Sequence, residues 1–203
     1  MALQPSLSPF LIGSKSSPHT LEFWYDIVCP FSKKSYNTTY NLLKPWVLEG
    51  KLKDKVQILL RLQPQPWHAS SQLTHEAVLA VARVAPDQLL EYLDALYKVS
   101  EQFYDIPSSN STPVQLREKI LDVGIPILGE EKVAKAKDLL VLRSTPNGGN
   151  AVTDDLKYFI KLGRQNGIHV SPTVTWDGLV ASDVYSSWAE AEWTKFFDER
   201  VKV

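Results

Sequence analysis

The chain has 203 residues, enough to bury a sizeable core as one domain or as a domain that carries a large insertion. Its 22 basic and 23 acidic residues give a formal net charge of -1, which argues against nucleic acid or an anionic membrane as a partner. No stretch approaches ~18 uninterrupted apolar residues, so we expect no transmembrane helix.

The first part of the chain predicts a strand, a helix and a second strand. The aromatic run "TLEFWYD", residues 20–26, favours a strand, and the only cysteine follows it in Cys29-Pro30. Residues 31–48 indicate a helix, because proline is tolerated in a first turn. Residues 55–62, "KVQILLRL", predict a strand buried on both faces. Such a unit is normally parallel and right-handed.

The middle of the chain predicts helices and no strand. The helical segments that we expect are 75–84, 87–103, 113–123 and 130–142. They form a block inserted between the two halves of an α/β domain. The predicted division of the chain is therefore 1–73, 74–143 and 144–203.

The last part of the chain returns to an α/β pattern. Residues 144–150, "STPNGGN", are rich in turn formers, and a helix with one apolar face follows from Val152 to Gly163. Two short β-prone runs flank Asp177-Gly178 and predict a hairpin. A capping box at residues 187–190, "SWAE", predicts the start of the final helix.

The predicted order is strand, helix, strand, helical block, helix, strand, strand, helix, which resembles the thioredoxin fold. Three stretches, "FWYDIVCPFS", "LQPQPWHASSQLTHEA" and "GIHVSPTVTWDGLV", make the chain similar to the DsbA-like branch of the thioredoxin superfamily. That branch includes DsbA, kappa-class glutathione transferases and 2-hydroxychromene-2-carboxylate isomerases. The fold class that the resemblance implies is α/β, a thioredoxin fold with an inserted all-helical domain.

The resemblance also implies which residues form the site. Cys29 is the position of the nucleophile, and Pro172 is implied to be a cis-proline that faces it. In such proteins the backbone just before the cis-proline binds an extended thiol partner. The implied catalytic residues are Cys29, Ser32 and Pro172, and the implied glutathione- or substrate-binding residues are Pro30, Phe31, Trp67, His68, Val170 and Ser171.

Ser32 departs from the dithiol pattern, because it stands where the second cysteine of the motif would be. A dithiol cycle therefore cannot run within one chain. The leading hypothesis is a monothiol, glutathione-linked thiol-disulfide oxidoreductase that uses Cys29. The alternatives are a kappa-class transferase-like or isomerase activity with glutathione as cofactor, and a thioredoxin-fold protein that binds without catalysis. The kappa-class relatives are dimers, so the resemblance allows a homodimer.

The residues themselves support two interpretations of Cys29. A thiol at a helix N-terminus is favoured as thiolate, because unpaired backbone N–H groups and the helix dipole favour negative charge. Cysteine is also often a small buried apolar residue. Ser32 could donate a hydrogen bond to the thiolate or be an ordinary first-turn serine. Lys33 and Lys34 could strengthen the effect or point into solvent.

Other polar residues near the motif also carry alternatives. Asp26 could relay protons or cap a turn. Trp67 and His68 follow the second strand, where a parallel sheet presents its ligand-binding ends. His68 could bind a glutathione carboxylate, act as a base, or pack against the helical block. His169 lies three residues before Pro172.

We expect no metal site, since one cysteine and four scattered histidines provide no paired ligands. Residues 1–20 lack the basic start and the continuous apolar centre of a secretory signal. A single cysteine also fits a reducing compartment, so we expect a cytoplasmic protein whose partner is glutathione or a small thiol or disulfide.

Overall fold

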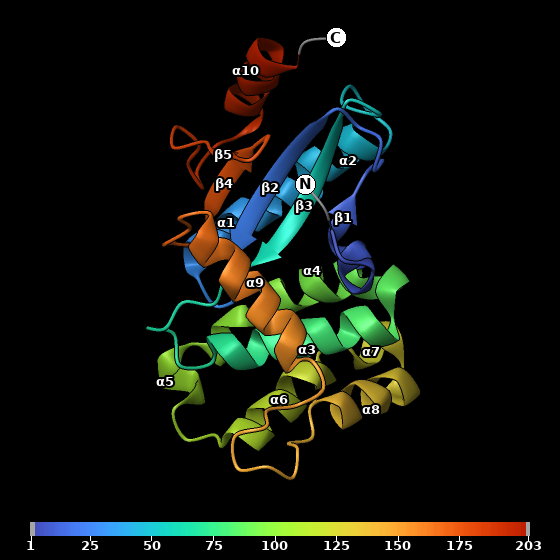
Figure 1. Cartoon of the computed structure of the whole chain (residues 1–203), viewed down its shortest axis with the longest axis vertical. Coiled ribbons are helices and arrows are strands. Elements are labelled where there is room, and N and C mark those ends of the chain that lie inside the picture. Colours follow the sequence, from blue (N-terminus) through green and yellow to red (C-terminus); the bar gives the residue numbers. More distant parts are fainter. Residues whose placement is uncertain (1–2, 202–203) are drawn as a thin grey trace.

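The computed structural model describes residues 3–201 and contains a five-stranded sheet in the order β1-β3-β2-β4-β5. The strands are β1 Leu11–Ile12, β2 His19–Tyr25, β3 Val56–Leu62, β4 Thr173–Trp176 and β5 Leu179–Val180. The α-helices are α1 Pro30–Thr38, α2 Lys44–Leu48, α3 Ser71–Val84, α4 Leu89–Val99, α5 Asp105–Ser108, α6 Pro113–Asp122, α7 Ile125–Leu128, α8 Glu130–Leu139, α9 Thr153–Gln165 and α10 Glu190–Arg200. Helices α3 to α8 lie beyond the end of the sheet to which β2 and β3 point (Figure 1).

The centre of the sheet is the parallel pair that the sequence predicts. In β2 and β3, Phe23 lies opposite Leu60, and β4 pairs antiparallel with β2 on its other side, with Val174 opposite Phe23. The predicted hairpin is confirmed, since β4 and β5 pair across the Asp177-Gly178 turn. This topology brings the segment before β4 to the end of β2 where the first helix begins.

Alternation along β2 buries both faces of the sheet. Phe23 is fully buried, and its ring contacts Trp193 of α10 at a centroid distance of 5.8 Å. Trp24 points to the opposite face, which α9 covers. A Cβ added at Gly163 of α9 would lie 3.3 Å from the Trp24 ring, so the helix backbone approaches the sheet closely because this residue is glycine.

A buried ion pair crosses the face of the sheet under α9. Glu22 of β2 accepts hydrogen bonds from Arg61 of β3 at 2.9 and 2.6 Å and from the Thr175 hydroxyl of β4 at 2.8 Å. Glu22 and Arg61 are at most 1% exposed. The three central strands are therefore joined by side chains as well as by their backbone ladder.

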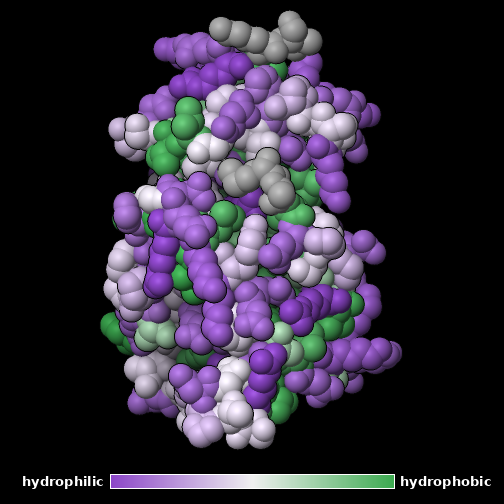
Figure 2. Space-filling view, in the orientation of Figure 1, coloured by the Kyte–Doolittle hydropathy of each residue, from purple (hydrophilic) through white to green (hydrophobic). Residues whose placement is uncertain are grey.

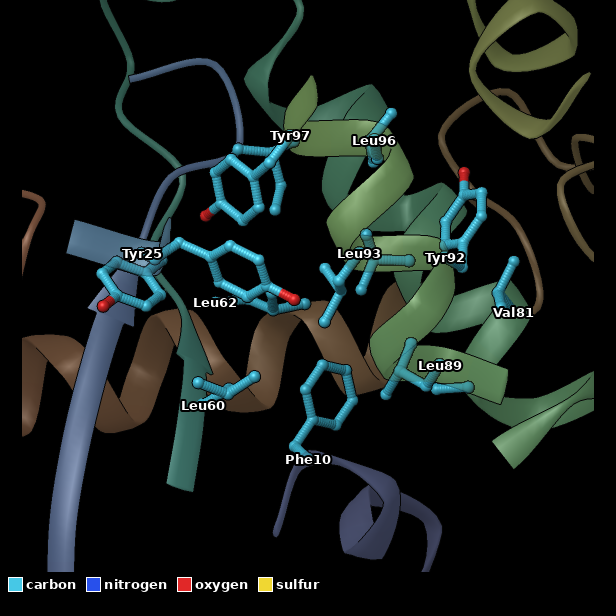
Figure 3. Close-up of a cluster of buried hydrophobic side chains, with 14 of the residues drawn as sticks. Phe10, Tyr25, Leu60, Leu62, Val81, Leu89, Tyr92, Leu93, Leu96 and Tyr97 are labelled. Atoms are coloured by element: carbon cyan, nitrogen blue, oxygen red, sulfur yellow. The ribbon is translucent and has the colours of Figure 1, made fainter. Parts of the chain in front are cut away.

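The helices beyond the sheet share one hydrophobic core with it (Figure 3). Phe10, Leu60 and Leu62 come from the sheet side, and Leu93 and Tyr97 come from α4. The predicted division into three segments of sequence stays a prediction.

Polar contacts join these helices to one another and to the sheet layer. The Tyr92 hydroxyl of α4 donates a 2.9 Å hydrogen bond to the Ile120 carbonyl of α6. Arg83 of α3 pairs with Asp155 of α9 at 2.7 Å. Since α9 covers the sheet, this pair ties the helical block to the α/β part.

Several local expectations differ from the structure, and one of them is the helix predicted at 75–84, which begins earlier, at Ser71, as α3. Residues 31–48 do form a continuous helical segment, but a π-helical turn, η2 Thr39–Leu43, connects α1 to α2 ahead of Pro45. The wider turn lets the helix continue through a proline, which removes a backbone donor. Residues 87–103 contain α4 between two 3-10 turns, η3 Pro86–Gln88 and η4 Ser100–Phe103.

The final helix also begins later than its predicted capping box. It starts at Glu190, and the Ala189 N–H is capped by the Glu192 carboxylate at 3.0 Å. The capping-box prediction at residues 187–190 was therefore wrong, because the next carboxylate along the chain provides the cap. The sequence also gave no indication of β1. This strand has only two residues and follows the 3-10 turn η1 Pro5–Phe10.

The view in Figure 2 shows a face covered largely by hydrophilic residues, with hydrophobic residues in separate small groups. Among the helices of residues 3–201, none has the length and apolar character needed to cross a membrane.

Burial of four tyrosines predicts how stability responds to alkaline pH. Burial raises the pKa of Tyr25, Tyr36, Tyr92 and Tyr97 well above the ordinary value of 10.0. An unfolded chain releases these protons near pH 10, whereas the folded chain retains them, so the stabilisation is present below pH 10 and is lost as the pH rises. Each pH unit above 10 lowers the free energy of unfolding by about 1.4 kcal/mol per tyrosine.

We therefore predict that phenolate absorbance of these four residues appears only together with the loss of far-ultraviolet circular dichroism. Tyr92→Phe should lower the number of protons released in the alkaline transition by about one. Full phenolate absorbance in a protein that retains its circular dichroism would contradict this account.

Candidate functional site

Cys29 lies at the junction between β2 and α1, as the sequence predicts. The strand ends at Tyr25, and the Cys29 N–H closes a tight turn by donating to the Asp26 carbonyl at 3.2 Å. Cys29 is then the N-cap of α1, and its carbonyl accepts from the Lys33 N–H at 3.0 Å. Pro30 fits the first helical position because that position needs no N–H donor.

The thiol faces the loop that leads into β4. The Ser171-Pro172 peptide bond is cis, as the resemblance implies, and Cys29 Sγ lies 3.3 Å from the Ser171 carbonyl oxygen. At this distance the thiol donates a hydrogen bond to the carbonyl oxygen. Cys29 is 5% exposed, so the residue is almost fully buried. Pairing of Trp24 with Thr173 holds the two segments together.

Ser32 stabilises the turn before the cysteine. Its side chain is fully buried, and its hydroxyl oxygen accepts from the Asp26 N–H at 3.2 Å. Within the described residues the Ser32 hydroxyl makes no hydrogen bond with Cys29, so the suggested contact with the sulfur is absent here. Lys33 binds Glu101 at 2.9 Å and Lys34 is exposed, so Lys33 joins α1 to the helical block.

The carboxylate of Asp26 lies at the centre of a buried polar network. Its Oδ1 accepts from the Val28 N–H at 3.2 Å and from the Ser71 hydroxyl at 2.9 Å. Its Oδ2 accepts from the Gln65 N–H at 3.0 Å and from His68 Nδ1 at 2.8 Å. Asp26 therefore caps its own turn, and it also binds the loop that follows β3. The capping alternative for this residue is therefore observed, and the proton-relay alternative stays a prediction.

His75 extends this network and was not identified from the sequence as part of the site. It lies in the second turn of α3 and is fully buried. Its ring nitrogens lie 2.6 Å from the Ser71 carbonyl oxygen and 3.1 Å from the Tyr25 carbonyl oxygen. The signal that could have found Ser71 and His75 is their position just after β3, because parallel neighbours β2 and β3 end at the same edge of the sheet.

Two cavities open beside this network. The first, which we call the Cys29 hollow because Val28 and Pro30 flank Cys29 in the sequence, has a volume of about 190 Å³. Its lining residues are Val28, Pro30, His68, Tyr104 and Asp105, and the Cys29 side chain is not one of them. The second, which we call the α9 cavity, has a volume of about 520 Å³ and lies between α9 and the loop after β3. His68 lines both of them, whereas His169 lines the α9 cavity.

Three of the predicted binding residues expose apolar side chains. Phe31 follows the cysteine, Val170 precedes the cis-proline loop, and Trp67 is adjacent to His68; each is more than half exposed. They come from three separate segments, which are α1, the loop after β3 and the loop before β4. This arrangement provides an apolar surface for a substrate rather than a closed pocket.

The backbone beside the cis-proline offers a second means of binding. Among the described residues, the N–H groups of Val170 and Ser171 have no hydrogen-bond partner, so they are available to an extended peptide. Within residues 3–201, no three histidine, cysteine, aspartate or glutamate side chains come together as a metal site.

Comparisons with known proteins identify the fold. No protein-family model matches the chain, and no curated protein matches it. Among solved structures, a candidate protein-disulfide isomerase from Pseudomonas syringae is 26% identical, with a TM-score of 0.73, covering 94% of this chain and 98% of that chain. The thiol-disulfide oxidoreductase MdbA from Corynebacterium diphtheriae is 19% identical, with a TM-score of 0.60, covering 87% and 83%.

A third similar structure is the thiol-disulfide exchange protein alpha-DsbA2 from Wolbachia pipientis. It is 16% identical, with a TM-score of 0.62, and the likeness covers 93% of this chain and 85% of that chain. These likenesses extend over the sheet and the inserted helices together. The chain therefore has the thioredoxin fold in the form found in DsbA-like proteins.

Proposed function

We propose that the protein is a thiol-disulfide oxidoreductase with Cys29 as its single redox thiol. The observation that carries this proposal is the position of Cys29 Sγ, which lies at the start of α1 and 3.3 Å from the carbonyl oxygen before the cis-proline. The structures similar to this chain include proteins described as a candidate disulfide isomerase, an oxidoreductase and a thiol-disulfide exchange protein.

The second thiol of the reaction comes from glutathione or a similar small thiol. Cys29 is the only cysteine, and Ser32 occupies the position from which a second cysteine would resolve a disulfide. In the first step, Cys29 attacks the glutathione sulfur of a mixed disulfide, forms a Cys29-glutathione disulfide and releases the substrate thiol. In the second step, another glutathione attacks that disulfide, forms oxidised glutathione and restores the Cys29 thiol. The net reaction reduces the substrate and oxidises two glutathiones to one disulfide.

Substrate binding in this proposal uses the surface around the thiol. Phe31, Trp67 and Val170 contact apolar parts of the substrate, and the free N–H groups of Val170 and Ser171 pair with its backbone. The reaction requires a pool of reduced glutathione, so we place the protein in the cytoplasm.

We predict that the protein reduces a peptide whose cysteine carries glutathione, in the presence of reduced glutathione, and that Cys29→Ala lowers this rate to the uncatalysed level. Intact mass spectrometry should show one glutathione on the wild-type chain after oxidised glutathione is added, and its removal by excess reduced glutathione. The variant should unfold at the wild-type temperature. Absence of the adduct and of turnover would exclude the proposal, and glutathione binding that persists in Cys29→Ala would favour the transferase or isomerase alternative.

A second prediction concerns the missing cysteine. Ser32→Cys should create an intramolecular disulfide with Cys29, because residues three apart in a helical turn have Cβ atoms about 5–6 Å apart, close enough for small shifts to form the bond. Mild oxidation should remove both free thiols, measured by alkylation and mass spectrometry.

The matched control is Ser35→Cys, another buried serine of α1. Residue 35 lies six residues after Cys29, about 9 Å along the helix axis, too far for a disulfide. Both thiols should therefore remain free in this variant. Two free thiols in oxidised Ser32→Cys would contradict the assigned geometry.

A further inference from the structure

We propose that His68, held in place by Asp26, is the acid-base residue that moves the proton during thiol exchange at Cys29. This inference rests on the proposed function and assigns a role to a residue other than the thiol. Three observations carry it: the hydrogen bonds of Asp26, the position of His68 in the Cys29 hollow, and the hydrogen bond of the thiol itself.

The hydrogen bonds of Asp26 determine which nitrogen of His68 carries the proton. Three donors besides His68 reach this fully buried carboxylate, namely the N–H groups of Val28 and Gln65 and the Ser71 hydroxyl. With donors on both oxygens, the carboxylate acts as an acceptor, so His68 Nδ1 donates to it across 2.8 Å. In the neutral ring, Nε2 is then left as the proton acceptor.

The position of His68 places this ring at a hollow that the two neighbours of Cys29 in the sequence also line. Its side chain is 20% exposed and lines the Cys29 hollow together with Val28 and Pro30, the two neighbours of Cys29 in the sequence. The fully buried Asp26 carboxylate orients the ring, and the hollow leaves the ring accessible to a substrate. This combination is typical of a general acid or base.

The thiol needs such a group, because its present partner cannot take its proton. Cys29 Sγ donates to the Ser171 carbonyl oxygen, and a carbonyl oxygen is too weak a base to accept the proton when the sulfur attacks. In the first step the proton passes to His68 Nε2 as the Cys29-glutathione bond forms. The substrate sulfur leaves with the electron pair of the broken disulfide and takes the proton from His68. In the second step His68 accepts the proton of the attacking glutathione and returns it to the Cys29 sulfur.

Other charged groups also face His68 and will contribute to any pH profile. Asp105 lines the Cys29 hollow, and its Oδ1 accepts from the Ala69 N–H at 3.1 Å, which fixes the turn after His68. Arg164 and His169 face it from the α9 cavity. Because these groups would also change a pH profile, the experiment compares two leaving groups at one pH.

The experiment measures exchange by wild type and His68→Gln with two mixed disulfides, one that releases an alkyl thiol and one that releases thionitrobenzoate. The alkyl thiolate is strongly basic and needs a proton as it leaves, whereas thionitrobenzoate leaves as the anion. We expect His68→Gln to lower the exchange rate about 10²-fold with the disulfide that releases an alkyl thiol. With the disulfide that releases thionitrobenzoate, the rate should fall by about tenfold or less. A structural role for His68 would lower both rates by the same factor, and that result, or no change in either, would overturn the inference.

A second measurement distinguishes the loss of an acid-base group from misfolding of the variant. His68→Gly should lose the alkyl rate in the same way, and added imidazole should restore it by occupying the vacated hollow. No rescue by imidazole in a folded variant would count against an acid-base role.

The matched control is His19→Gln. His19 also binds an aspartate, Asp177, across 2.8 Å, but it lies at the other end of β2. Both of its rates should equal those of wild type, and a selective loss of the alkyl rate in this variant would contradict the inference. Absence of Cys29-dependent exchange in the wild type would refute the proposed function itself, whereas normal exchange with unaltered His68 variants would refute only the role of His68.

Discussion

The carboxylate of Asp26 is the interaction on which the rest of the site depends. It is buried at the point where the parallel strands β2 and β3 end, and its two oxygens bind both loops that leave this edge of the sheet. Four donors offset the cost of burying the group, and one of them, the Val28 N–H, belongs to the turn that precedes Cys29. Loss of any donor from this set would leave the carboxylate less well compensated and the turn less well defined.

The helical block contributes to the chemistry through a few contacts with this edge. Tyr104 and Asp105 provide one wall of the Cys29 hollow, and Glu101 binds Lys33 of α1. Lys33, one of the two lysines that the sequence suggested for the thiol, therefore binds the helical block instead. The environment of Cys29 consists instead of the helix N-terminus and the Ser171 carbonyl.

Some of the site could be predicted from the sequence because its signals are local. A cysteine before a proline at a strand-to-helix junction, and a Ser-Pro before a hairpin, identified the two segments that meet at Cys29 and Ser171. The partners of Asp26 could not be assigned in this way, because His68 and Ser71 lie more than forty positions along the chain and reach it only through the pairing of β2 with β3. The position of Ser32 was predicted, but its hydrogen bond was not, since the N–H of Asp26 competes for the hydroxyl. Similarly, β1 is too short to show the alternation of a strand in the sequence. The last helix is capped by the Glu192 carboxylate and not by the predicted capping box.

The most direct test of the central claim is a crystal structure of the protein after treatment with oxidised glutathione. The account predicts a disulfide between Cys29 and the glutathione cysteine, with the glutathione backbone paired to the N–H groups of Val170 and Ser171. The bond from Cys29 Sγ to the Ser171 carbonyl should then be lost. A structure in which Cys29 remains a thiol bound to that carbonyl, with glutathione absent or bound elsewhere, would contradict the claim that Cys29 is the working thiol.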